Sequence, residues 1–276
     1  MPVFGPVTSP FYLEFTELDD LFPGGDSMIN LALSLLASAL VYVGFYLWLK
    51  VWYQAMIPAA LVVGLVYYFL SRATWDRVRV VIEDAMKYLE GLSSRRDIAQ
   101  RPEQRNQIVD EAIRRLKVGY AYGKWQFMVH SQIDAQIGIV LYQMRNDINA
   151  ALPYLEKSFQ RNWIAQAMLA VVYMKKHNPD KMKNTFELAI RFNKKQPLLW
   201  GVFAYCLNKI KDTDGAIDVL NRGLAENKNN AALQENLTQL QNGKKMKMKE
   251  FGDQWYQFNL EKPQMQKVKT ARFSRR

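Results

Sequence analysis

Few residues of this sequence have the chemistry of an active site. The chain of 276 residues contains two histidines, His130 and His177, and a single cysteine, Cys206. A single cysteine can form neither an internal disulfide nor a cysteine-based zinc site, and neither histidine lies in a metal-binding motif. We interpret both histidines as solvated or packed side chains and predict no metal site and no cofactor.

Sequence motifs of catalysis are also missing. The chain has no GxSxG, Walker A, GxGxxG or HExxH motif. The stretch GYAYGKW, residues 119–125, has two glycines but no strand-to-helix context for phosphate binding. We expect Cys206 to act as a small apolar side chain within a helix. The sequence therefore favours a protein that is not an enzyme, and a membrane enzyme is the least favoured alternative.

Charge is distributed unevenly along the chain. Lys and Arg number 37 against 26 Asp and Glu, which gives a net charge of +11. Residues 1–26 carry five acidic residues and no basic one, whereas residues 244–276 carry ten basic residues against three acidic ones. We treat these two ranges as an acidic N-terminal segment and a basic, aromatic C-terminal tail.

The tract between Ser27 and Ser71 contains one charged residue, Lys50. It separates uncharged runs of 23 residues (27–49) and 21 residues (51–71). About 20 residues suffice to cross a bilayer, so each run can span one alone. We predict a transmembrane helical hairpin over 27–71 with its turn near 48–54. A soluble core helix, or a shorter second helix that starts at Pro58, are the alternatives.

Aromatic and basic residues mark both ends of this tract. Trp and Tyr prefer the headgroup layer, and a lysine can extend its ammonium group to the same layer. The predicted membrane-interface residues are Trp48, Lys50, Trp52, Arg72 and Trp75. The basic flank after residue 71 places both termini in the cytoplasm by the positive-inside rule, and we expect an integral protein of a bacterial cytoplasmic membrane.

Small polar residues recur along the first uncharged run. Ser27, Asn30, Ser34 and Ser38 are three or four residues apart and so share one helix face. Such a stripe suits close helix contact. We favour packing within the hairpin over a transport site, and self-association of hairpins is a further use of this face.

After the hairpin and as far as residue 243, the chain has helical patterns without strand alternation. We expect a juxtamembrane helix and linker over 72–106 and a helical domain over 107–243. Triplets that begin at Arg145, Asn178 and Asp212 lie 33 and 34 residues apart, and each offers a helix N-cap residue.

Small and large residues repeat with the same period. Ala170 takes a small position, with large residues at Leu169 and Tyr173; the register 34 residues later gives Phe203, Ala204 and Leu207. This pattern resembles the tetratricopeptide repeat (TPR) family. The resemblance covers about half the chain and implies an all-α fold, in which a TPR-like α-solenoid follows the membrane hairpin.

The resemblance also implies a groove for peptides, lined by the first helix of each repeat. The groove positions fall on Val171, Met174 and Lys175 in one repeat and on Tyr205, Asn208 and Lys209 in the next. Lys175 and Lys209 above an apolar floor suit an acidic, hydrophobic segment. One such segment, YLEFTELDDLF (12–22), lies in this chain. Two solvated helix ends are the alternative reading of the lysines.

We therefore predict a membrane-anchored scaffold or adaptor that contacts membrane lipid and binds unidentified proteins through its cytoplasmic repeats. The alternative is a lipid- or nucleic-acid-binding protein that acts through the basic tail. We rank aromatic residues of the tail packed on the last repeat first, lipid contact second and nucleic acid third.

Overall fold

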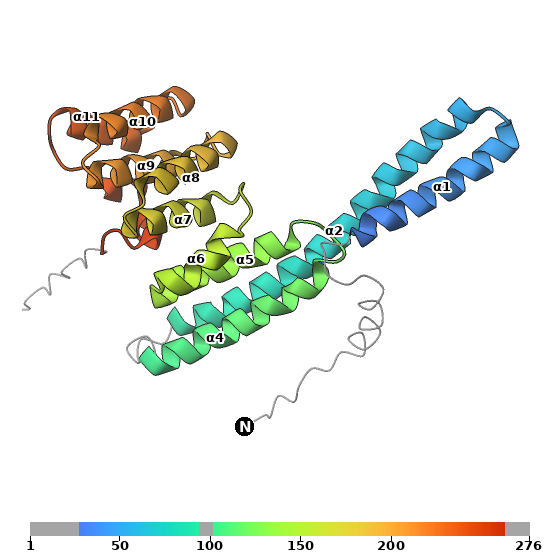
Figure 1. The fold of residues 1–276 in the computed structure, drawn as a ribbon, viewed down its shortest axis with the longest axis horizontal. Helices are drawn as coiled ribbons and strands as arrows, with labels where there is room; N and C mark the ends of the chain where they lie inside the picture. Colours follow the sequence, from blue (N-terminus) through green and yellow to red (C-terminus); the bar gives the residue numbers. More distant parts are fainter. Residues whose placement is uncertain (1–27, 94–101, 263–276) are drawn as a thin grey trace, which may run out of the picture. The chain divides into compact units, whose positions relative to one another are not determined.

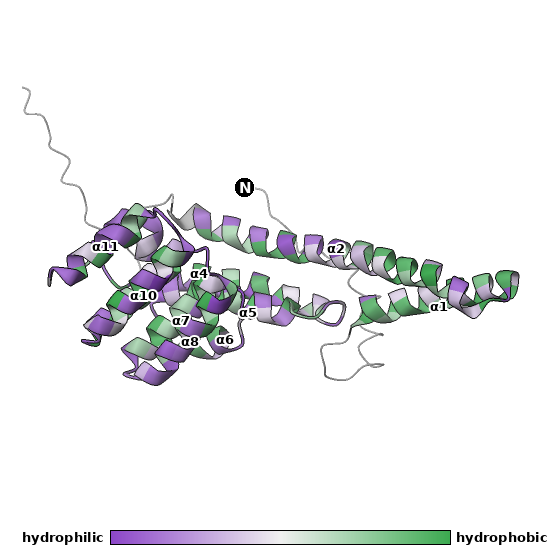
Figure 2. Cartoon of the chain, turned by 90° about the horizontal axis from the view of Figure 1, so that it is seen from above, coloured by the Kyte–Doolittle hydropathy of each residue, from purple (hydrophilic) through white to green (hydrophobic). Residues whose placement is uncertain are grey.

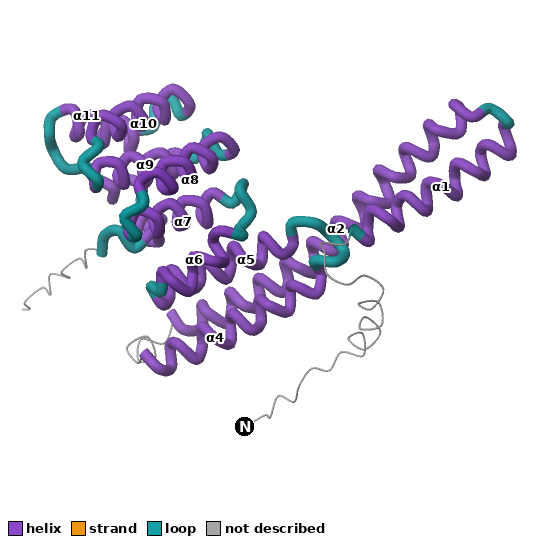
Figure 3. Tube along the Cα trace, viewed as in Figure 1, coloured by secondary structure: helices purple, strands orange, loops and turns teal. Residues whose placement is uncertain are grey.

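The computed structural model describes residues 28–93 and 102–262. Figure 3 shows helices and loops in these parts of the chain, and no strand. The chain divides into two compact units, residues 1–133 and 134–276. The acidic segment 1–26 and the end of the basic tail lie outside the described residues.

The first unit contains a long helical hairpin. Helix α1 (Ile29–Leu49) lies against the first half of helix α2 (Trp52–Ser93), as Figure 1 shows. Lys50 adopts a left-handed conformation with a φ of 54°, and its N–H bonds to the carbonyl of Tyr46. This confirms the turn predicted near 48–54, because one left-handed residue ends the first helix as a glycine often does.

Helix α2 is longer than either uncharged run. It starts at Trp52 and contains Pro58, so the alternative in which the second helix begins at Pro58 is wrong. The helix continues without interruption to Ser93, within the predicted juxtamembrane helix and linker of residues 72–106. Figure 2 shows its first half as mainly hydrophobic and its second half as mixed. Both α1 and α2 are long and apolar enough to cross a membrane.

The small polar stripe of α1 faces the second helix. Asn30, Ser34 and Ser38 are the buried residues of α1, and the Ser38 hydroxyl donates to the carbonyl of Ala59 over 2.8 Å. Ala55 and Ala59 of α2 are also buried. Packing within the hairpin is therefore confirmed, and this face is occupied within one chain.

Helix α4 (Pro102–Val118) packs along the second half of α2. It begins with Pro102 within the range where we predicted a linker, since proline suits the first position of a helix. The short helix η3 (Gly119–Tyr122) follows α4, and α5 (Val129–Val140) runs across the boundary between the two units.

The second unit is a series of short helices. They are η4 (Leu141–Arg145), α6 (Ile148–Glu156), α7 (Trp163–Lys175), α8 (Pro179–Phe192), α9 (Pro197–Lys209), α10 (Thr213–Glu226), α11 (Ala231–Gln241), η5 (Met248–Phe251) and η6 (Asp253–Phe258). Helix α7 pairs with α8, and α9 pairs with α10. Consecutive pairs touch through α7 and α9.

The predicted N-caps begin three of these helices. The side chains of Asp147, Asn178 and Asp212 accept hydrogen bonds from the backbone N–H three residues later, at 2.9, 3.1 and 3.0 Å. Each bond satisfies a donor that the helix itself leaves without a partner. The recurring triplets are thus helix starts, as predicted.

The positions that the 34-residue pattern assigns to small and to large side chains are mostly buried. Ala170, Phe186, Ala204 and Leu220 have no or almost no exposed surface. Gly223 leaves space for the indole of Trp200, because a Cβ there would lie 2.9 Å from Trp200 Cγ. A small residue on one helix opposite a large residue on the other therefore allows α9 and α10 to approach closely.

Candidate protein-binding face

The predicted groove residues come from two neighbouring helices. Val171, Met174 and Lys175 belong to α7, whereas Tyr205, Asn208 and Lys209 belong to α9. Val171 is fully buried and Tyr205 is 6% exposed, so neither is free to receive a partner. Met174, Asn208 and the two lysines keep exposed surface.

A segment of the same chain covers this face. Residues 246–261, called the C-terminal segment here, place Phe251 against Gly201, where an added Cβ would lie 2.5 Å from the ring. Trp255 and Phe258 are fully buried. The Trp255 ring contacts the Tyr205 ring edge-on, with centroids 4.8 Å apart. The aromatic tail residues are therefore packed, as predicted, but they reach beyond the predicted last repeat: Trp255 contacts Tyr205 of α9, whereas Phe258 contacts Trp163 of α7.

Glu261 joins the same segment to α9 and to its own Trp255 through hydrogen bonds. The Tyr205 hydroxyl donates to one carboxylate oxygen of Glu261 at 3.0 Å, and the Trp255 indole N–H donates to the other at 3.2 Å. Burial and the nearby Glu261 carboxylate raise the pKa of Tyr205. The face thus binds a segment of this chain through aromatic anchors and the carboxylate of Glu261.

Lys175 is held by this arrangement. Its ammonium group donates to the Tyr142 hydroxyl at 2.8 Å and to the Asn259 carbonyl at 3.3 Å. The Tyr142 hydroxyl in turn donates to the Phe258 carbonyl at 2.5 Å. Burial lowers the pKa of Lys175. Lys175 therefore stabilises the C-terminal segment, a role that its position in the repeat did not predict.

Lys209 has different surroundings. Its ammonium group lies 5.2 Å from the centre of the Tyr205 ring, and it forms no ion pair with another described residue. Beside it is a cavity of about 540 Å³, called the lysine pocket here. Its lining residues are Met174, Lys175, His177, Lys209, Ile210, Asn259 and Leu260.

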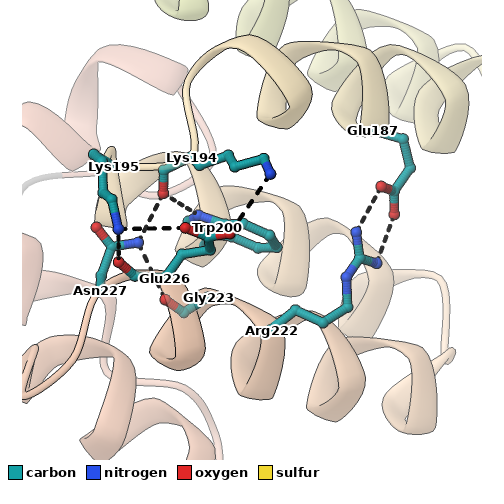
Figure 4. A network of polar contacts seen from close by, with 8 residues as sticks. All are labelled: Glu187, Lys194, Lys195, Trp200, Arg222, Gly223, Glu226 and Asn227. Carbon is teal, nitrogen blue, oxygen red and sulfur yellow. Dashed lines mark hydrogen bonds and ion pairs between the residues drawn. The ribbon is translucent and has the colours of Figure 1, made fainter.

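A second depression, of about 380 Å³, lies beside Trp200. Figure 4 shows the Arg222 guanidinium paired with the Glu187 carboxylate through two bonds, at 2.8 and 2.7 Å. The Lys194 and Lys195 ammonium groups both lie near the Glu226 carboxylate. Arg191 also lines this depression and forms no ion pair with another described residue. Two carboxylates, those of Glu187 and Glu226, line it as well, whereas no carboxylate lines the lysine pocket.

The predicted membrane-interface residues lie at the two ends of the hairpin. Trp48, Lys50 and Trp52 surround its turn, and the two tryptophans are 76% and 61% exposed. Arg72 and Trp75 follow the apolar half of α2. Arg72 is exposed and donates to the Tyr68 hydroxyl at 3.3 Å.

Sequence reasoning missed two residues that shape the face. Tyr142 is fully buried within η4, and Asn259 donates to the Tyr142 carbonyl at 3.1 Å. More than a hundred positions separate them, so no local pattern could have paired them. The sequence does contain one local sign of this contact, Gly201, which lies on α9 one turn before Tyr205 and leaves room for Phe251.

Neither known protein families nor curated proteins match this sequence. Function is therefore inferred from the chemistry of the face and of the hairpin.

Proposed function

We propose that this protein is a membrane-anchored scaffold or adaptor. In this proposal α1 and α2 cross the membrane as a hairpin, both termini are cytoplasmic, and TPR-like repeats bind other proteins. We place the hairpin in a bacterial cytoplasmic membrane, and the basic flank that follows the hairpin sets its orientation.

The dimensions and surface of the hairpin support an anchor. Helix α1 has 21 residues, which corresponds to about 31 Å and matches a hydrocarbon core of about 30 Å. Its large apolar side chains point away from the helix pair, and Leu40 is 77% exposed. A continuous apolar surface of this kind is costly in water and favourable in lipid.

The lysine pocket is the observation that carries the binding function. It places the ammonium group of Lys209, which forms no ion pair with another described residue, beside an apolar lining of Met174, Ile210 and Leu260. A cation above apolar surface suits a partner that offers a carboxylate beside an apolar side chain. As the alternative, Lys175 and Lys209 stabilise their helix ends, where cations favour the helix dipole.

The C-terminal segment indicates the kind of partner. It contacts α7 and α9 through aromatic rings and the Glu261 carboxylate, which is the combination predicted for a ligand of this face. A protein partner then docks beside this segment, in the part of the face left open. The acidic stretch 12–22 of this chain has similar chemistry and lies outside the described residues.

A binding measurement tests the proposal. We would reconstitute the full chain in lipid nanodiscs and titrate it into a fluorescent peptide of residues 10–24. We expect binding, and we expect Lys209→Glu to weaken it by about fivefold, since an exposed ion pair contributes up to about 1 kcal/mol. A chain that starts at residue 27 should bind more tightly, because its own acidic segment no longer competes.

Lys228→Glu is the matched control, since Lys228 is exposed and lies outside the pocket. It changes the net charge equally and should leave the affinity unchanged. Equal weakening by both variants would indicate a general charge effect. If neither this peptide nor other acidic, aromatic peptides bind, the proposed use of the pocket is wrong.

A further inference from the structure

Residues 119–128, called the interfacial loop here, are bound to the start of α1. The N–H groups of Ile29 and Asn30 donate to the carbonyls of Lys124 and Trp125, each at 3.2 Å. The first N–H groups of a helix have no partner within it, and Met28 supplies no side-chain cap. The loop therefore caps α1 with its own backbone and is fixed at this end of the helix.

Gln126 connects the same loop to both helices of the hairpin. Its side-chain oxygen accepts from the Ser71 hydroxyl at 2.7 Å and from the Asn30 amide at 3.4 Å. Its amide nitrogen donates to the Tyr67 hydroxyl at 2.8 Å. Gln126 is 5% exposed, and the Asn30 amide also donates to the Thr74 hydroxyl at 2.9 Å. These bonds place the loop level with Ile29 and Ser71.

That level coincides with the end of the apolar part of the hairpin. Residues 52–71 of α2 correspond to about 30 Å of helix, as the 21 residues of α1 correspond to about 31 Å. The first charged side chain of α2 follows at once, at Arg72. If the hairpin spans a bilayer, Ile29 and Ser71 must both lie near its cytoplasmic boundary.

The side chains of the loop suit that boundary. Tyr122, Lys124 and Trp125 are partly exposed, and Phe127 is 37% exposed. Aromatic residues favour the headgroup layer, and a lysine there attracts lipid phosphate. Arg72, Tyr68 and Trp75 supply similar chemistry from α2, about one turn from Ser71.

We propose that the interfacial loop lies in the headgroup layer of the bilayer, as a membrane contact in addition to the two spanning helices. This inference rests on the proposed transmembrane hairpin. The loop carbonyls and Gln126 hold the aromatic side chains at the correct depth, so the first unit contacts lipid on the cytoplasmic side without a further anchor. The partner is the lipid surface itself, with anionic headgroups favoured by Lys124 and Arg72.

Spin-label depth measurements test this inference. We would attach a spin label at Phe127→Cys in the full chain, reconstituted in vesicles of phosphatidylcholine and phosphatidylglycerol. Collisions with oxygen increase with depth in lipid, and collisions with a water-soluble nickel chelate decrease. We expect the label at 127 to show more oxygen and fewer chelate collisions than a label at Glu83→Cys. Glu83 is exposed on α2, 12 residues and about 18 Å beyond Ser71.

Two controls separate this inference from the anchor itself. Leu40→Cys, on the exposed face of α1, should report the deepest position. The unsubstituted chain supplies the background, because Cys206 is buried and burial raises the pKa of its thiol. If position 40 is deep but position 127 matches position 83, the loop does not contact lipid and the anchor stands. If position 40 reports water, the transmembrane proposal itself is wrong.

Discussion

At the scale of single residues, equal positions in a repeat do not have equal roles. Lys175 and Lys209 lie 34 residues apart, yet Lys175 bonds to Tyr142 and Asn259, while Lys209 borders an open pocket. The difference comes from the C-terminal segment, which covers one lysine more than the other. The position of a residue in the 34-residue pattern determines where its backbone lies. The contacts of its side chain depend on the rest of the chain, here on the C-terminal segment.

Asp212 allows a pH test at this scale. Its carboxylate accepts from the Lys183 ammonium group at 2.7 Å and from the Gly215 N–H at 3.0 Å, and these bonds lower its pKa. Because the unfolded chain binds this proton more readily, the stabilisation is present above about pH 4 and is lost as the pH falls through the lower, folded-state pKa.

We expect Asp212→Asn to keep the helix cap and lose only the ion pair, which contributes up to about 1 kcal/mol. Asp212→Ala should also lose the cap, at a cost of about 1 kcal/mol and about 2–4 °C in Tm. Thermal unfolding between pH 2 and 7 would measure this. A difference between the wild type and Asp212→Asn that does not shrink at low pH would contradict the assignment.

At the scale of elements, the sequence predicted local features better than distant pairings. The hairpin turn at Lys50, the caps at Asp147, Asn178 and Asp212, and the buried stripe of α1 all follow from residues within one or two helical turns. The start of α2 was left open, because Pro58 is compatible both with a helix start and with an early helix position. The C-terminal segment was predicted to pack, but its contacts with Tyr142 and Lys175 need three-dimensional information.

Within the C-terminal segment, Trp255 is the strongest candidate for a stabilising anchor. It is fully buried and contacts both Tyr205 and Glu261. We expect Trp255→Ala to reduce the free energy of unfolding by about 3–5 kcal/mol, since it removes a large buried ring and leaves a cavity. Chemical denaturation of the full chain would measure the change.

Phe192→Ala is a matched control, because Phe192 is 43% exposed and its loss should cost far less. A small effect at Trp255, equal to that at Phe192, would mean that the segment is only loosely attached. The face would then be open to partners over its whole length.

At the scale of the whole molecule, each of the two compact units has one of the two proposed roles, membrane anchoring and protein binding. Residues 1–133 contain the apolar hairpin and the interfacial loop, and residues 134–276 contain the helix pairs, the C-terminal segment and the lysine pocket. An anchor with two spanning helices places both of its ends on one side of the membrane. Such a topology brings the acidic N-terminal segment and the pocket into one compartment.

The topology of the hairpin is the central claim and the one most directly measured. A cysteine would be added at one position at a time, as Lys50→Cys or Lys228→Cys, and intact cells would be treated with a thiol reagent that cannot cross the membrane. Both native side chains are exposed, and Cys206 is buried. We predict labelling at 50 from outside, and labelling at 228 only after the cells are permeabilised. Labelling at 228 but not at 50 in intact cells would contradict the account.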